Sequence, residues 1–155
     1  MFKLNRMTDY GAVILSALAT EWRFNHGESL SATDISEKSG LTQASTAKIL
    51  KILSASGLVQ STRGKNGGYV LNAAPEEITV AAIVEAMEGP IAMTACVETS
   101  LDPCDAKNSC FLSGNWERVN QAISNALSAI TLADLIDPES HFRPIGDVIS
   151  TPKHH

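Results

Sequence analysis

Three cysteines lie within one short stretch of the chain, in the pattern Cys96-x7-Cys104-x5-Cys110. Thiolates are soft ligands that suit iron–sulfur clusters, zinc or Cu(I). The spacing lacks the Cys-x2-Cys pairs of zinc ribbons, so zinc is the weaker expectation. Cysteines are also often buried as plain hydrophobic side chains, but three in one polar, acid-rich loop fit that alternative poorly. Three thiolates leave one coordination site of a cluster to another group, which predicts a labile cluster of the kind that suits a sensor.

Cysteine usage also bears on the compartment. An odd number of cysteines does not fit the disulfide framework of a small secreted protein. In a reducing compartment such a group is more often metal-binding or redox-active. The sequence has no apolar run of about eighteen residues or more, and its start is too polar for a secretory signal. We therefore expect a cytoplasmic protein that has no membrane partner.

Charge is distributed unevenly along the 155 residues. The net charge is −5, yet residues 1–72 carry eight Lys/Arg against five Asp/Glu, a balance of +3, and residues 73–155 carry four against twelve, a balance of −8. Between Lys38 and Pro75 five basic residues stand with no acidic one. This asymmetry is expected when one half of a protein faces DNA, although the charge alone also fits an ordinary solvated surface.

Two short helices joined by a tight turn are predicted within this basic stretch. Ser31 and Asp34 form an approximate capping box for the first helix, and Gly40 ends it. Thr42 begins the second helix, which is expected to run to about Ser56. This arrangement is typical of a helix-turn-helix.

The second of these helices has one apolar side and one polar side. The apolar positions, expected to be buried, are Ala47, Ile49, Leu50 and Leu53. The remaining side is long enough to enter a major groove and to touch base edges or phosphates. The candidate DNA contacts on it are Thr42, Gln43, Ser45, Thr46, Lys48 and Lys51.

A β-hairpin is predicted directly after the second helix. Two β-prone runs, 58–62 and 69–71, flank a tip that contains Asn66-Gly67-Gly68, which is expected to supply positive φ angles. A hairpin in this place is a wing. Arg63 and Lys65 stand beside glycines that let the backbone approach a phosphate ridge, and Arg63 is a candidate for a narrow minor groove. Some winged helices bind protein instead of DNA.

Further helices complete a mainly α-helical fold with a small β-hairpin wing. Residues 11–19 predict a buried helix, capped by Thr8 or Asp9. Caps at Thr79 and Thr131 begin two more helices. Between them lies a heptad seam with spacings of 3 and 4 that is too short to be stable without a partner, which predicts a long dimerisation helix. The seam residues are Trp116, Val119, Ile123, Ala126 and Ile130.

These elements divide the chain into four parts. Residues 1–89 are expected to form a winged helix-turn-helix DNA-binding domain, 90–114 a cysteine-containing cluster-binding loop, 115–137 the dimerisation helix with a short capping helix, and 138–155 an irregular tail. No enzyme motif is present, because the glycines of 64–68 lie between strands and not between a strand and a helix. The histidines make no metal-binding pair on a helix: His26, His141, His154 and His155. We expect neither catalysis nor a small-molecule substrate.

In combination, the motifs resemble the IscR/NsrR-type winged-helix iron–sulfur transcription regulators over about residues 1–136. The resemblance rests on Thr8-Asp9-Tyr10, the runs 34–37, 56–59 and 131–135, the wing 63–69 and the three-cysteine loop. Within that family, the runs 88–91 and 115–116 look most like the regulator of the SUF iron–sulfur assembly operon. The resemblance implies a homodimer in which the long helix crosses its partner and the cluster loop lies near the partner's DNA-binding domain.

The resemblance also implies a ligand set. Cys96, Cys104 and Cys110 would hold an iron–sulfur cluster, [2Fe-2S] with [4Fe-4S] as the alternative. IscR-like proteins have a histidine three residues after the last cysteine, where this chain has Ser113. NsrR-like members use an N-terminal aspartate of the partner chain, and Asp9 stands in that place. Asp9 is therefore the expected fourth ligand; its local alternatives are Glu98, Asp102 and Asp105.

The expected function is that of a cluster-responsive transcription regulator, a repressor of SUF iron–sulfur assembly genes, which binds a double-stranded DNA operator as a homodimer. The IscR-like recognition helix carries a glutamate where Ala47 stands here, so the base preference is expected to differ. One alternative is a nitric-oxide-, redox- or zinc-responsive regulator of the same fold. The other is a cluster carrier or scaffold that does not bind DNA.

Overall fold

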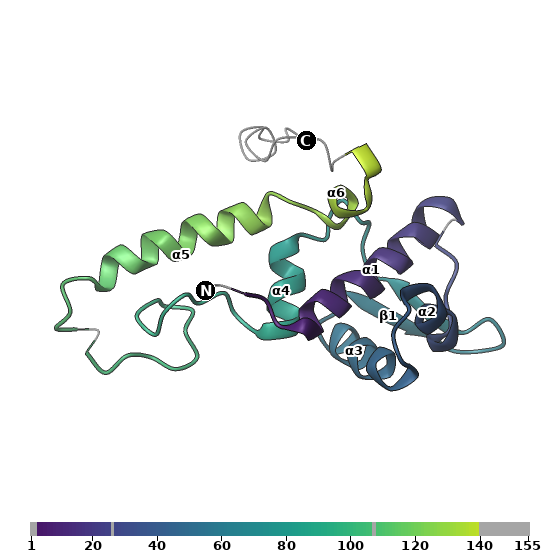
Figure 1. Cartoon of the computed structure of the whole chain (residues 1–155), viewed down its shortest axis with the longest axis horizontal. Helices are drawn as coiled ribbons and strands as arrows, with labels where there is room; N and C mark the ends of the chain where they lie inside the picture. Colours follow the sequence, from purple (N-terminus) through teal and green to yellow (C-terminus); the bar gives the residue numbers. More distant parts are fainter. Residues whose placement is uncertain (1–2, 26, 107, 140–155) are drawn as a thin grey trace.

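The computed structural model describes residues 3–25, 27–106 and 108–139. The described ranges form six helices and one two-stranded antiparallel sheet (Figure 1). The mainly α-helical fold with a β-hairpin is thereby confirmed. None of the helices in these ranges is both long enough and apolar enough to cross a lipid bilayer. In chain order the elements are α1 (Arg6–Phe24), α2 (Ala32–Ser39), α3 (Gln43–Ala55), β1 (Val59–Thr62), β2 (Gly68–Leu71), α4 (Val80–Glu88), α5 (Ser113–Ser128) and α6 (Leu132–Ile136).

Four of the expected helix starts are confirmed by their capping hydrogen bonds. The Ser31 and Thr131 side chains each accept from the backbone amide three residues on, and the aspartate there accepts in return. The Thr42 and Thr79 hydroxyls accept from the amides of Ser45 and Ala82 at 3.2 and 3.1 Å. Local polar chemistry therefore fixes these four boundaries.

The start of α1 differs from the expectation. Asn5, and not Thr8 or Asp9, is the N-cap, and its side-chain oxygen accepts from the Met7 amide at 3.0 Å. The Thr8 hydroxyl is engaged elsewhere, because it donates to the carboxylate of Glu88 at the end of α4. The helix then runs through Phe24, five residues beyond the apolar run that predicted it.

The main core lies between α1, α2, α3, the hairpin, α4 and α6, and we call this part of the molecule the head. Its fully buried side chains come from α1, α2, α3 and α6, with Val59 and Leu71 closing it from the sheet; the largest are Ile14, Leu15, Ile35, Ile49, Leu50, Leu53 and Leu132. Burial of this many aliphatic side chains is the main stabilising term of a small domain. The head therefore has its own core.

The hairpin pairs Val59 with Leu71 and Thr62 with Gly68. Its second strand is joined to the segment before α2, since Leu30 and Tyr69 exchange backbone hydrogen bonds of 3.0 and 2.7 Å. The expectation that the glycines after Asn66 supply positive φ is wrong: in this turn the positive φ, +112°, belongs to Gly64. Gly67 and Gly68 serve close approach instead, because a Cβ on Gly67 would stand 2.7 Å from the Thr62 carbonyl oxygen and one on Gly68 would collide with that of Leu30.

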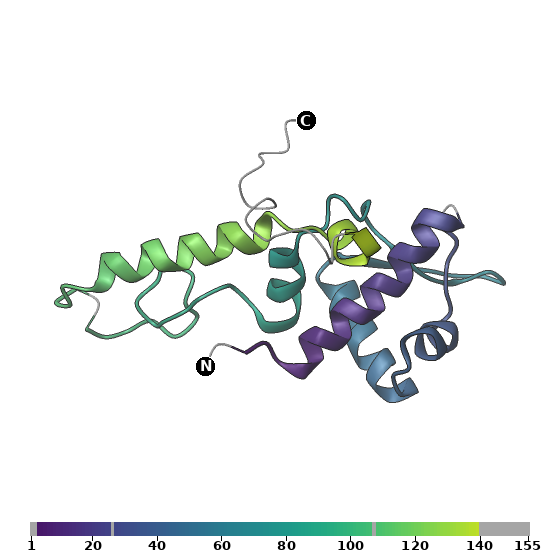
Figure 2. The same ribbon diagram turned by 45° about the horizontal axis from the view of Figure 1, so that its top comes forward.

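A second backbone bridge joins the two ends of the excursion that contains α4 and α5. Thr79 pairs with Thr131: the Val80 amide donates to Ile130 O at 2.8 Å and the Leu132 amide to Ile78 O at 2.7 Å. From this bridge α5 extends away from the head, and residues 89–106 and 108–112 pass along one side of it (Figures 1 and 2). Helix α5 begins at Ser113, two residues before the expected boundary.

Part of the predicted tail lies outside the described residues. The structure describes the chain only to Glu139, so the expected irregular tail beyond it, with His141, His154 and His155, is not covered. His26 also lies outside the described residues.

Candidate DNA-reading face and cysteine site

The cysteines lie on residues 89–112, which we call the cysteine segment and which contains neither helix nor strand in its described part. Backbone contacts fold this segment back on itself: the Cys104 amide donates to the Ala95 carbonyl at 3.0 Å, and the Cys96 amide donates to Thr94 Oγ1 at 3.3 Å. Cys104 is thereby brought beside Cys96. All three cysteines are free thiols and half-buried, so the donors that the spacing predicted are available.

The thiols of Cys96 and Cys104 interact directly. Partial burial raises the pKa of the Cys96 thiol above 9.0, and the hydrogen bond and charge of Cys104 raise it further, with a smaller contribution from the charge of Cys110. Within the described ranges, no three His, Cys, Asp or Glu side chains stand close enough together to hold a metal ion. The donor set suits a soft metal centre, but Cys110 has to approach the other two thiols before all three share one.

Helix α3 presents an exposed side that differs in two positions from the predicted one. Gln43, Lys48 and Lys51 are exposed, as expected. Thr46 is completely buried, and its Oγ1 has no hydrogen-bond partner, so its expected outward position is wrong. Ala47 was expected in the core and is exposed instead. The core contacts of Ile49, Leu50 and Leu53 place Thr46 inward, because residues three and four apart share a helix face.

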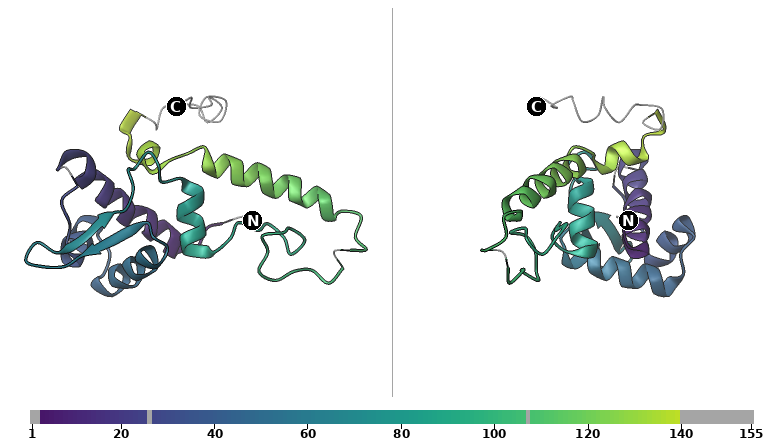
Figure 3. Two further views of the ribbon diagram at one scale, coloured as in Figure 1. Left: turned by 180° about the vertical axis from the view of Figure 1, so that it is seen from behind. Right: turned by 60° about the vertical axis from the view of Figure 1, so that its left-hand side comes forward.

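The exposed start of α3 and the tip of the hairpin supply the remaining candidate contacts. Thr42 is exposed and Ser45 is half-buried, with their hydroxyls 3.0 Å apart. Arg63 and Lys65 are exposed on the turn between β1 and β2, which projects beyond the helices (Figure 3). The sequence reasoning therefore located the exposed cations of this face correctly.

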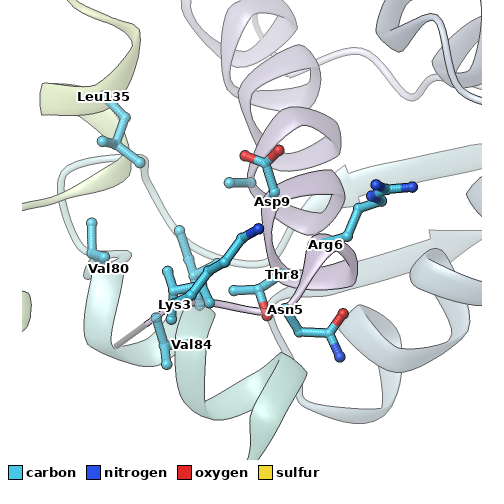
Figure 4. A pocket seen from close by; sticks show the side chains of 11 residues that line it. Lys3, Asn5, Arg6, Thr8, Asp9, Val80, Val84 and Leu135 are labelled. Atoms are coloured by element: carbon cyan, nitrogen blue, oxygen red, sulfur yellow. The ribbon is translucent and has the colours of Figure 1, made fainter. Parts of the chain in front are cut away.

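Asp9 lies in a different part of the molecule, at the edge of an open hollow of about 890 Å³ between α1, α4 and α6. Figure 4 shows Asp9 on α1, with Val80 and Val84 of α4 and Leu135 of α6 around the same hollow. No residue of the cysteine segment lines it. Glu98, Asp102 and Asp105 are exposed on the segment, and within the described residues none of them completes a metal-binding group with the cysteines.

Comparison with known proteins gives the family. The model of the Rrf2 family, described as iron-dependent transcriptional regulators, matches residues 4–138. The chain belongs to the Rrf2 family. Rrf2 relatives include the transcriptional regulator IscR of Erwinia tasmaniensis, which is 30% identical over 132 residues that make up 85% of this chain and 79% of that protein. IscR of Yersinia pestis is 29% identical over the same lengths.

Solved structures of two regulators share the fold. CymR of B. subtilis, titled the global cysteine regulator of that organism, matches with a TM-score of 0.65 at 32% identity, covering 88% of this chain and 97% of CymR. IscR of T. potens matches with a TM-score of 0.63 at 29% identity over 92% and 93% of the two chains. The shared fold confirms the expected winged-helix class. Because the relatives are regulators and not enzymes, this Rrf2 chain is an IscR-like transcription regulator.

Two polar residues of this Rrf2 chain were missed by the sequence reasoning. Asn120 of α5 is buried and hydrogen-bonded to the cysteine segment, and Glu88 connects the end of α4 to the start of α1. The one available signal for Asn120 was that asparagine is a poor residue for a helix interior. Glu88 was noted only within the run 88–91 that carries the resemblance; its structural role was not predicted, because its partners are eighty or more residues away.

Proposed function

We propose that this chain is an iron–sulfur-responsive transcriptional repressor of SUF-type iron–sulfur assembly genes. The observation that carries the proposal is that three free, half-buried thiols, two of them in contact, lie on one segment of a chain whose head exposes the cations of a DNA-reading face. The family description, which names iron, and the similarity to IscR support it.

The proposed DNA contacts follow from exposure and residue type. Gln43 and Ser45 on α3 would contact base edges, while Thr42, Lys48 and Lys51 would bind phosphates on either side. The hairpin would bring Arg63 and Lys65 to the adjacent backbone or minor groove. Thr46 is left out because it is buried. Exposed Ala47 would leave a small apolar surface where IscR-like helices have an acid, so its preferred bases would differ.

A second copy of the chain is the proposed partner. The first part of the expected seam of α5 is uncovered, with Trp116 39% and Val119 43% exposed, and an open groove continues along Ala122 and Ala126. In the cysteine segment Phe111 is 89% exposed. Apolar surface of this extent is expected to be covered in an assembly. The partner's Asp9 would then supply the fourth ligand, since the hollow beside it is separate from the cysteines of its own chain.

The residues that would hold the cluster are Cys96, Cys104 and Cys110. When bound, the cluster supplies an inorganic centre that iron shortage or oxidants can remove. The thiols must lose their protons to bind it, and Cys110 must close on the pair formed by Cys96 and Cys104. A cofactor changes DNA affinity only through a differential interaction with two states of the protein, and such couplings typically amount to about 1–3 kcal/mol.

The test is to purify the protein without oxygen and to measure iron, sulfide and zinc content with absorption and Mössbauer spectra. An operator is recovered by selection from a random duplex library, and its affinity is measured before and after iron is removed by a chelator. We expect a cluster per protomer and an affinity that changes about fivefold or more. The variant C96S/C104S/C110S should bind no cluster, and its operator affinity should not respond to the chelator. Ser109→Ala should keep the cluster and the response.

Other outcomes separate the alternatives. A colourless protein that contains zinc, or whose operator affinity follows formation of a disulfide, is a zinc or thiol-redox regulator. A protein that holds a cluster but shows no salt-dependent affinity for any duplex is a carrier or scaffold.

A further inference from the structure

The most buried polar side chain of α5 within the described residues points at the cysteine segment. Asn120 is only 4% exposed. Its Oδ1 accepts from the Met93 amide at 2.9 Å, and its Nδ2 donates to the Ile91 carbonyl at 3.0 Å and to Thr99 Oγ1 at 3.4 Å. Every polar atom of the carboxamide is therefore used, and each is used on the chain that surrounds Cys96.

Other contacts fix the same stretch. The Thr99 hydroxyl donates to the Ile91 carbonyl at 2.7 Å, and the Glu98 amide donates to Glu117 Oε2, one turn before Asn120, at 3.0 Å. Val97 is buried beside Cys96, and Ile91 packs in a small cluster with Val84 and Ile123. Residues 91–99 thus have polar attachments on one side of α5, while the open groove along Val119, Ala122 and Ala126 lies on the other.

We infer that Asn120 is a positioning residue for the cysteine site. By binding both Ile91 and Met93, its carboxamide determines where the chain enters the stretch that carries Cys96, and it ties that stretch to the helix whose other side is open to a second copy. Residues 91–99 and α5 then move as one unit. The link to a cluster site rests on the proposed function, whereas the hydrogen bonds of Asn120 are present in the protein without any cofactor.

The chemistry of the side chain makes the inference specific. The position requires a donor and an acceptor at the end of a short, planar group, and asparagine supplies both. Asn120→Asp keeps the shape but replaces the donor with an oxygen that faces the Ile91 carbonyl. The Ile91 carbonyl would then keep only the Thr99 hydroxyl as a donor and would face a carboxylate oxygen, which weakens the native arrangement more than the loss of an exposed hydrogen bond does.

The experiment compares Asn120→Asp with Gln121→Ala, a change at the next residue, which is exposed and bonds only to Asn125 in the described structure. In the cofactor-free protein, amide exchange at Met93 and alkylation of Cys96 by iodoacetamide should each become about tenfold faster in Asn120→Asp. In the reconstituted protein, loss of iron to a chelator should accelerate about tenfold to a hundredfold, and the circular dichroism of the cluster should change. Gln121→Ala should match the wild type in all four measurements.

Thr99→Val provides a second variant at an exposed residue in case Asn120→Asp does not fold. It removes the hydroxyl that bonds to Ile91 O, so the same changes are expected in the same direction and to a smaller extent. Wild-type rates of exchange, alkylation and iron loss in both variants would overturn the inference. If the wild type takes up no iron, the proposed function fails, and the exchange and alkylation rates still decide the role of Asn120.

Discussion

The head and the cysteine segment are stabilised in opposite ways. The head buries a continuous aliphatic core and fastens its helices with local caps. The cysteine segment buries Ile91 and Val97, has no regular secondary structure in its described part, and depends on side chains of α5 for its course. Segments with few buried apolar contacts open at low free-energy cost. A DNA-binding domain benefits from the first arrangement, and the proposed cluster site would benefit from the second.

The largest effect that tests this comparison is on global stability. Leu50→Ala removes a fully buried side chain from the core of the head and should lower the free energy of unfolding by about 3 kcal/mol. Leu101→Ala, in the cysteine segment and 83% exposed, should change it by less than about 0.5 kcal/mol. Urea denaturation measures both. Equal losses would show that the two regions do not differ as described.

Affinity for DNA without an operator should depend on the head alone. Lys48→Ala and Arg63→Ala should each weaken binding to duplex DNA by about 1 kcal/mol and reduce the slope of log K against log salt by about 1. Fluorescence anisotropy at several salt concentrations provides the measurement. On a duplex without an operator, C96S/C104S/C110S should keep the wild-type slope. A salt slope that changes in the cysteine variant, and not in Lys48→Ala or Arg63→Ala, would contradict the assignment of DNA binding to the head.

A smaller effect is expected when the cysteine segment itself is loosened. Val97→Ala deletes two buried methyl groups beside Cys96, a loss of about 1 kcal/mol by area. Hydrogen–deuterium exchange should increase at residues 91–104 and remain unchanged in α1 and α3. Faster exchange throughout the head would mean that the two regions unfold as one unit.

The smallest effect concerns an ion pair between α1 and α2, both in the head. Lys38 Nζ lies 2.8 Å from Glu21 Oε1; the Lys38 hydrogen bond, followed by that of Asn25, lowers the pKa of Glu21 below 4.5, and Glu21 raises the pKa of Lys38 above 10.5. Since the pKa of Glu21 is lower in the folded state, its contribution is present above pH 4.5 and is lost as the pH falls. The contribution of Lys38 to stability is lost as the pH rises above 10.5.

Glu21→Gln should therefore lower the free energy of unfolding by about 0.5–1 kcal/mol at pH 7. The difference from the wild type should shrink in urea melts at about pH 3, where the carboxyl group becomes protonated. A difference that is the same at both pH values would exclude the ion pair as its source.

How far the sequence predicts the structure differs between the same two regions. In the head, Ser31, Thr42, Thr79 and Thr131 were recognised as caps because their partners lie three residues away, within the reach of local chemistry. The errors arose where a distant partner decides. Thr8 looked like a cap, but its hydroxyl bonds to Glu88; Thr46 looked like a surface residue, but the helix phase set by the core places it inside.

In the cysteine segment, the sequence predicts the donors but not their arrangement. Cys96, Cys104 and Cys110 were found from residue type and spacing alone. The contact between Cys96 and Cys104 depends on a backbone hydrogen bond from Cys104 to Ala95, and the course of the chain depends on Asn120. Irregular chain has no period from which such tertiary contacts can be derived.

The bridge between Thr79 and Thr131 has a mechanical consequence. Helix α5, with sixteen residues, is roughly 24 Å long; it is joined to the head by the two backbone hydrogen bonds of this bridge, and its Ile123 and Leu127 pack on the apolar cluster of α4. A rotation of α5 by about 5° about the bridge would move its far end by about 2 Å. In the proposed dimer, a small rotation of α5 would thus change the spacing between the two wings, the dimension that a stretch of duplex must match.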